Sequence, residues 1–114
     1  MSTCLFCRIV ERTVPSNITY EDDLALAFED VNPQAPVHIL VIPKRHIQSV
    51  GDLETADSIL LAHLVLTCAK IAKQKGLAQS GYRLVTNTGA NGGQTVFHLH
   101  WHLLGGRPMR WPPG

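Results

Sequence analysis

The order of apolar runs and turn residues in the first half of the chain predicts three strands. Apolar and β-branched residues dominate positions 18–20, 24–28 and 37–42. Asp22 and Asp23 lie between the first two runs as the turn of a hairpin, and residues 32–36 form a connector rich in turn residues. Pro43 is expected to end the third strand or to place it near an edge, because proline has no N–H to donate.

Two helices are predicted around these strands. Residues 5–11 provide one or two helical turns, with Phe6 and Ile9 among the apolar positions. A longer helix has Asp52 as its N-cap candidate and Gly76 where a C-terminal glycine belongs. Two adjacent apolar stripes recur at helical spacing between them: Leu60, Leu64, Cys68 and Ile71 in one, and Leu61, Val65, Ala69 and Ala72 in the other. Such a helix is either simply well buried or, as we expect, packed on both a sheet and a partner subunit.

The second half of the chain predicts two more strands, at residues 82–86 and 96–104. A polar loop at 87–95 with three glycines separates them. The tail 105–114 ends in Trp-Pro-Pro-Gly and is not expected to form regular structure. These elements predict one domain over residues 1–114, of the α+β class, with a five-stranded antiparallel sheet, one long helix and one short helix.

Composition and charge exclude several classes of protein. Hydrophobic residues make up 45% and charged residues 17%, which is typical of a compact globule. Ten basic and nine acidic residues give a net charge of +1 without a basic cluster, so no nucleic-acid partner is expected. The apolar stretch 59–72 is interrupted by His63, Thr67 and Lys70, and residues 1–20 lack a signal-peptide pattern. We therefore expect neither a membrane partner nor export, and a cytoplasmic location.

Three histidines in alternation are the main candidate for chemistry. On a strand, His98, His100 and His102 would share one face, while Leu99 and Trp101 would point to the other. Neutral imidazoles side by side suit metal ligation, proton transfer or nucleophilic attack. The glycines of the preceding loop would let backbone N–H groups approach an anion closely.

The run 98–104 resembles the motif of the histidine triad family, in which histidine alternates with apolar residues. Residues 28–36 resemble the nucleotide-pocket segment of the Hint branch of that family, and so do segments 41–44, 92–94 and 111–114. The resemblance covers essentially the whole chain. It implies a HIT-like fold in which two copies form a homodimer with a continuous ten-stranded sheet.

The resemblance also implies roles for individual residues. His100 would be the nucleophile that forms a nucleotidyl-histidine intermediate, with His102 and His38 lining the phosphate site. Asp30 would hydrogen-bond the ribose hydroxyls. The base would lie against Phe6, Ile9, Phe28 and Val31, and the phosphate or leaving group against Asn87, Gly93, Gln94 and Thr95. The family pattern usually has serine where this chain has Thr95, so the hydroxyl is kept but the added methyl narrows the site.

The implied activity is that of a purine nucleoside phosphoramidase, which would cleave the P–N bond of adenosine 5′-phosphoramidates and related adenylates and release AMP without a catalytic metal. A dinucleoside polyphosphate hydrolase of the Fhit branch is an alternative, although the Gly-Gly-Arg and Trp-Pro-Pro-Gly segments favour Hint. A transferase resembling galactose-1-phosphate uridylyltransferase would have proline where Leu99 stands. A nucleotide-binding regulator with incidental catalysis is the alternative outside the enzymes.

A structural zinc site is predicted at Cys4, Cys7, His46 and His98. The odd number of cysteines argues against a disulfide framework, and no predicted strand precedes the C-x-x-C pair as in a thioredoxin-like protein. That spacing places two thiolates on one tetrahedral ion, and two histidines would complete it. The uridylyltransferase branch binds zinc through the first motif histidine, which corresponds to His98. Alternatively, both cysteines are small apolar residues of the short helix, and His98 only supports the site.

Overall fold

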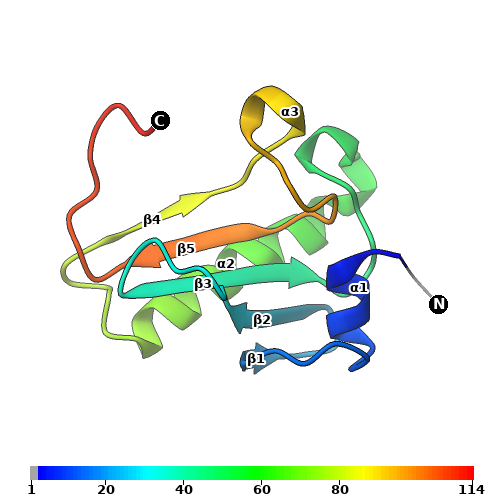
Figure 1. Cartoon of the computed structure of the whole chain (residues 1–114), viewed down its shortest axis with the longest axis horizontal. Coiled ribbons are helices and arrows are strands. Elements are labelled where there is room, and N and C mark those ends of the chain that lie inside the picture. The colour runs from blue at the N-terminus through cyan, green and yellow to red at the C-terminus, as the bar shows by residue number, and fades with distance from the viewer. Residues whose placement is uncertain (1–2) are drawn as a thin grey trace.

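The computed structural model describes residues 3–114 as a five-stranded antiparallel sheet with helices on both faces (Figure 1). The strands are β1 (Ile18–Glu21), β2 (Ala25–Glu29), β3 (Val37–Pro43), β4 (Tyr82–Val85) and β5 (Trp101–Gly105). The helices are α1 (Leu5–Val10), α2 (Ser58–Gln74) and the short α3 (Gly89–Gly92), with 3-10 turns at Val50–Asp52 and Thr55–Asp57. The strand order is β1-β2-β3-β5-β4, so the last strand of the chain lies inside the sheet. The predicted α+β class is confirmed, and α3 was not predicted.

The alternation of side chains along β2 and β3 divides the core into two layers. Ala27 and Val41 belong to the layer between the sheet and α2, where Leu64 and Ile71 of the helix join them. Their neighbours in sequence, such as Leu40, point to the other face and pack with Phe6 and Ile9 of α1. The sheet is therefore covered by α2 on one face, while α1 covers only part of the other and leaves room for a site beside it.

The α2 helix carries more apolar surface than its contact with the sheet uses. Leu64, Cys68 and Ile71 are almost fully buried, whereas Ile59 is 82% exposed and Leu66 is 67% exposed. By length and composition alone, Thr55–Gln74 satisfies the requirements of a membrane-crossing helix. A core helix satisfies the same requirements, and α2 packs on β3 and β5 as a core helix does.

The predicted start of the long helix was wrong. Asp52 does not cap it, because the Asp52 carboxylate accepts a hydrogen bond of 2.8 Å from the Ser49 hydroxyl inside the first 3-10 turn. A second turn follows, in which Asp57 accepts from the backbone N–H of Glu54 at 2.9 Å, and α2 begins only at Ser58. The end was predicted correctly: Gly76 follows the helix with φ of +75°, a conformation that glycine adopts without strain.

The last strand is shorter than predicted. It was expected over residues 96–104, but β5 begins at Trp101, opposite Val41 of β3. Beyond that pair β3 reaches Pro43, which has no N–H for a neighbour, and its carbonyl instead accepts from the ring of His98 at 2.8 Å. Two of the three motif histidines therefore lie in an irregular segment just before β5.

Candidate active site

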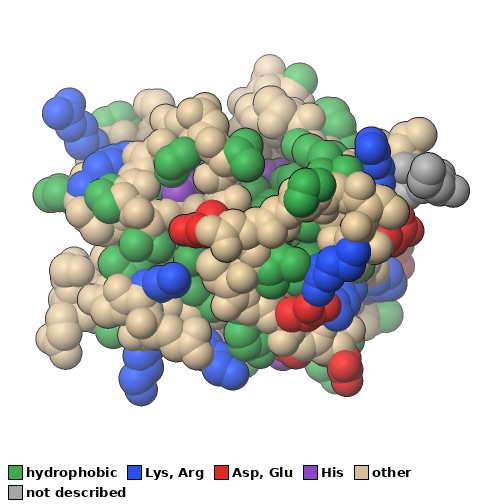
Figure 2. All heavy atoms as spheres, turned by 60° about the horizontal axis from the view of Figure 1, so that its bottom comes forward, with side chains coloured by type: hydrophobic (Ala, Val, Ile, Leu, Met, Phe, Trp, Pro, Cys, Tyr) green, Lys and Arg blue, Asp and Glu red, His purple; other side chains and the backbone are tan. Residues whose placement is uncertain are grey.

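The three motif histidines share one side of the chain, although only His102 belongs to a regular strand. The residues that alternate with them, including Leu99 and Leu103, are buried in the layer facing α2. The rings of His100 and His102 lie 4.9 Å apart between centroids. Alternation of the backbone thus holds through the unpaired segment, and the prediction of a common histidine face is confirmed. In Figure 2 only small areas of histidine are visible, recessed between hydrophobic and other side chains.

Hydrogen bonds fix which nitrogen of His100 carries the proton. Its Nδ1 lies 2.7 Å from the carbonyl oxygen of His98. A carbonyl can only accept, so Nδ1 must donate and the neutral ring keeps its lone pair on Nε2. Burial lowers the pKa of His100 below its ordinary value of 6.5, against the raising effects of that hydrogen bond and of Asp30. The ring is therefore neutral at pH 7, with a nucleophilic Nε2.

A second chain of hydrogen bonds orients His102. The backbone N–H of Gln34 donates to Nδ1 of His38 at 3.0 Å, so Nε2 of His38 carries the proton. That Nε2 lies 2.9 Å from Nδ1 of His102 and donates to it, which leaves the proton of His102 on Nε2. Asp30 completes the group, with a carboxylate oxygen 3.4 Å from Nε2 of His38. His102 is thereby prepared to donate a hydrogen bond, as a phosphate oxygen requires.

Burial also keeps this second pair neutral. It lowers the pKa of His102 to about 4, and the neighbouring His100 and His38 act in the same direction. Burial likewise lowers the pKa of His38, although Asp30 raises it. Neutral rings offer no positive charge to a phosphate, so binding of an anion here must rely on aligned hydrogen-bond donors.

A cavity of about 280 Å³ opens beside these histidines and contains most of the residues predicted to bind the nucleotide. Phe6 and Phe28 meet edge to face, 5.3 Å apart between centroids, and Phe6 also lies 5.1 Å from the ring of His100. The predicted residues that line it are Phe6, Ile9, Phe28, Asp30, Val31, Thr95, His100 and His102. An apolar slot with a carboxylate and two imidazoles at its edge suits a base, a ribose and a phosphate in that order.

Two of the predicted loop residues have a different position. The Gln94 side chain accepts from the N–H of Gly89 at 3.0 Å and donates to the carbonyls of Gln48 and Val96 at 2.7 and 3.1 Å. It therefore holds the α3 loop in place and is not directed into the cavity. Gly93 supplies the left-handed residue that ends α3, with φ of +81°. Both determine where Thr95 lies.

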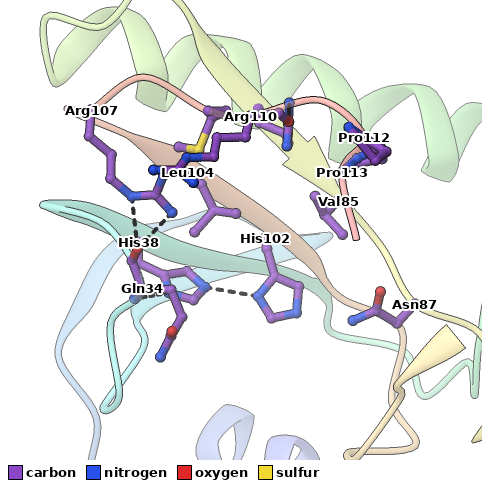
Figure 3. A pocket seen from close by; sticks show the side chains of 12 residues that line it. Gln34, His38, Val85, Asn87, His102, Leu104, Arg107, Arg110, Pro112 and Pro113 are labelled. Carbon is purple, nitrogen blue, oxygen red and sulfur yellow. Dashed lines mark hydrogen bonds between the residues drawn. The ribbon is translucent and has the colours of Figure 1, made fainter.

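A second cavity, of about 410 Å³, lies on the other side of His102 and was not predicted (Figure 3). Asn87, expected at the phosphate or the leaving group, lines this cavity together with His38 and His102. Arginines of β4 and of the C-terminal tail, with Pro112 and Pro113, form the rest of the wall. One signal for this cavity was present in the sequence, because basic residues recur just before the Trp-Pro-Pro-Gly ending, but no spacing rule placed them beside His102.

The predicted metal ligands are brought together from three separate parts of the chain. Cys4, Cys7, His46 and His98 offer ligand atoms that all lie within 4.8 Å of one another. Nδ1 of His98 is 3.4 Å from Sγ of Cys4 and 3.6 Å from Sγ of Cys7. Nδ1 of His46 is 3.3 Å from Sγ of Cys7 and 3.1 Å from Nδ1 of His98.

These separations fit a tetrahedral ion. Bonds of about 2.3 Å to sulfur and about 2.0 Å to nitrogen place neighbouring ligand atoms roughly 3.3 to 3.8 Å apart. Nε2 of His98 donates to the Pro43 carbonyl, so Nδ1 presents a lone pair to the cluster. Burial lowers the pKa of His98 to about 4, which keeps that lone pair available. The structure thus contains a Cys₂His₂ cluster that can hold a metal ion.

Comparison with known proteins supports one family throughout. Residues 11–109 match the sequence model of the HIT domain. The chain is 50% identical over 105 residues to the purine nucleoside phosphoramidase of Escherichia coli, an alignment that covers 92% of this chain and 88% of the relative. An uncharacterized HIT-like protein from Synechococcus elongatus is 58% identical over 110 residues, 96% of both chains.

A solved structure shows the same architecture. The crystal structure of a HIT family hydrolase from Legionella pneumophila has a TM-score of 0.97 to this chain, with 50% sequence identity. The match covers 98% of this chain and 100% of the other. The sheet order, the long helix and the position of the histidine segment therefore belong to a fold that has been determined by experiment.

Proposed function

The chain belongs to the HIT domain family, and from that premise we propose that it hydrolyses the P–N bond of adenosine 5′-phosphoramidates and related adenylates, releasing AMP. One observation carries the proposal: Nδ1 of His100 is committed to the carbonyl of His98, so Nε2 keeps its lone pair at the edge of the nucleotide-sized cavity. The identity to a purine nucleoside phosphoramidase supports the choice of substrate.

The proposed reaction divides into two displacements at phosphorus. In the first, Nε2 of His100 forms a bond to phosphorus while the P–N bond breaks. The leaving nitrogen takes up a proton from solvent and departs as the neutral amine, and the Thr95 hydroxyl assists by donating a hydrogen bond to it. In the second, water attacks phosphorus and releases a proton to solvent, the bond to His100 breaks and AMP leaves. His102, held by His38, donates to a phosphoryl oxygen in both steps.

Removing the nucleophile tests this proposal. His100→Ala should lower turnover of adenosine 5′-phosphoramidate by about a thousandfold or more, while AMP binding changes by less than about tenfold, because base and ribose contacts remain. AMP release is followed by chromatography and AMP binding by calorimetry. His63→Gln, on the opposite face of the sheet in α2, is the matched control and should keep full activity.

Mass spectrometry after rapid quenching provides a second readout. One adenylyl group should appear on the peptide that carries His100 in the wild-type protein and should be absent from the variant. AMP binding without turnover in the wild-type protein would contradict the proposed hydrolysis and favour a nucleotide-binding regulator.

We also propose that the Cys₂His₂ cluster binds one zinc ion with a structural role. The distances described above support it, and so does the placement of the cluster: it joins α1, the segment after β3 and the segment before β5. The ion would be separated from the substrate, since the His98 ring faces the cluster while its carbonyl holds His100. Zinc would supply a cross-link there and would take no part in the displacements.

A further inference from the structure

We infer that the arginine-lined cavity beyond His102 receives the leaving group of the substrate and that this leaving group is anionic, bearing carboxylate or phosphate. This inference rests on the proposed function and specifies its substrate class. The cavity of about 410 Å³ shares His102 with the nucleotide cavity, so the reacting phosphorus would lie where the two meet. With base and ribose on the side of Phe6 and Phe28, the group that departs must lie on the other side.

The walls of this cavity carry positive charge without a matching carboxylate. Arg83, Arg107 and Arg110 line it, and its lining residues include no Asp or Glu. Within residues 3–114, the ion pairs of the arginine side chains are those of Arg12 and Arg45, on other parts of the surface. Three guanidinium groups that share one cavity repel each other, and a bound anion would relieve that repulsion.

The arginines are held in place by backbone carbonyls, which accept hydrogen bonds but neutralise no charge. Nη2 of Arg83 donates to the carbonyl of Arg110 at 2.8 Å. Arg107 donates through Nε and Nη2 to the carbonyl of Gln34, at 3.1 and 3.0 Å. Figure 3 shows Arg107 and Arg110 on the tail that passes above His38 and His102. Because a guanidinium has five N–H donors, donors remain for an anion.

Two matched pairs of adenosine 5′-phosphoramidates test the inference. In one pair the amine is glutamate or its uncharged diamide; in the other it is 2-aminoethyl phosphate or 2-aminoethanol. We expect kcat/KM to be about tenfold higher or more for the anionic member of at least one pair, as charge-assisted hydrogen bonds predict. The ratio should fall as salt is raised, since the cavity is open to solvent. Comparing the pairs shows whether carboxylate or phosphate is preferred.

Arg83→Gln and Arg110→Gln identify the source of the preference. Each should reduce the anionic-to-neutral ratio severalfold with little effect on the neutral substrate, and Arg110→Glu should bring the ratio below one. Lys75→Gln, which removes an equal charge at the exposed end of α2, is the matched control and should leave the ratio unchanged. Thermal melting of each variant confirms that it is folded.

The two proposals can fail separately. Binding of all four compounds to His100→Ala is measured by calorimetry, so the preference of the cavity can be determined without turnover. If nothing is hydrolysed by the wild-type protein but the anionic compounds bind more tightly, the proposed hydrolysis fails and the inference about the cavity stands. Equal kcat/KM and equal affinity within both pairs, or a ratio unaffected by all three arginine variants, would overturn the inference.

Discussion

At the scale of single residues, backbone groups determine the tautomers of the active-site histidines. The His98 carbonyl acts on His100, and the Gln34 N–H acts on His38 and, through it, on His102. The alternation of His98, His100 and His102 predicted a common face correctly. It did not reveal that the His98 carbonyl selects the proton on His100, or that the backbone of Gln34 determines the tautomer of His38. Both contacts are local, but they depend on the backbone geometry and the side-chain rotamers, which the spacing of residue types along the sequence does not specify.

The lowered pKa of His102 predicts how stability depends on pH. Burial sets the pKa of the folded state at about 4, below the ordinary 6.5, so the unfolded chain takes up a proton in this window and the folded chain does not. The contribution of His102 to stability is therefore fully present above about pH 6.5 and is lost as the pH falls towards 4.

The measurement is urea denaturation of the wild-type protein and of His102→Gln at pH 7.5 and at pH 5. Between these values the free energy of unfolding should fall by an amount on the order of 1 kcal/mol more for the wild type than for the variant. Since His38 and His100 are present in both proteins, the difference reports the titration of His102 together with its interaction with these two rings. A variant with the same pH dependence as the wild type would contradict the assignment.

A second residue-scale prediction concerns Asp22 in the turn between β1 and β2. Burial raises the pKa of this carboxyl, but hydrogen bonds from Tyr20, the N–H groups of Leu24 and Ala25, and His63 outweigh that effect and lower it well below the ordinary 3.8. Its contribution is thus present above pH 3.8 and is lost on further acidification. The His63 ring, 2.7 Å from Asp22, connects this turn to α2.

Asp22→Asn should therefore destabilise the protein by about 1–2 kcal/mol at pH 7, because it weakens several hydrogen bonds to a charged acceptor. Urea denaturation measures the change. Asp23→Asn provides the control at the adjacent exposed position and should alter stability by less than about 0.5 kcal/mol. Equal effects of the two substitutions would show that the hydrogen bonds of Asp22 contribute nothing specific.

At the scale of elements, the sequence predicted strands and helices well where apolar residues recur at a single strand or helix spacing. It predicted their ends poorly where a side chain takes a hydrogen bond that the regular element would otherwise make with its backbone. The β2 and β3 strands were placed within a residue or two. The start of α2 was misplaced because the carboxylates of Asp52 and Asp57 close turns of their own. The start of β5 was misplaced because the Pro43 carbonyl binds the His98 ring in place of a strand partner.

The metal cluster is also a connection between elements, and its removal should act on folding. We predict about one zinc per chain in protein purified without chelator, and a lower melting temperature after chelation, because the ion would join the N-terminal helix to segments more than 35 residues away. The rate at a temperature where the protein is folded should change much less.

Cys4→Ser combined with Cys7→Ser tests the same site by mutation. The double variant should contain no zinc, should melt at the temperature of the chelated wild type, and should not respond to chelator. Zinc content near zero in the wild type, together with an unchanged melting temperature in the double variant, would show that the cysteines serve only as packing residues of α1.

At the scale of the whole molecule, one chain lines both cavities but leaves part of its apolar surface uncovered. The cavity beside Phe6 and Phe28 and the arginine-lined cavity are both lined by residues of this chain, and the tail lines the arginine-lined cavity of its own chain. The contribution of the tail to a partner's site stays a prediction. The outer side of α2, in contrast, leaves Ile59 and Leu66 exposed, and β4 ends the sheet with an unpaired edge.

These two features predict a two-fold dimer in which α2 and β4 meet their counterparts, joining the sheets into ten strands. Light scattering should then give about 25 kDa, twice the chain mass of 12.5 kDa. Leu66→Glu places a charge on the exposed apolar side of α2 and should shift the protein towards monomer at micromolar concentration, because burial of that charge would be costly.

Leu24→Glu, at a leucine of the β1–β2 turn that is 46% exposed, is the matched control and should remain dimeric. If the wild type is a stable monomer at micromolar concentration, the prediction is wrong. If Leu66→Glu dissociates and Leu24→Glu does not, the interface lies on α2, and activity measured on the separated monomers shows whether the site works without its partner.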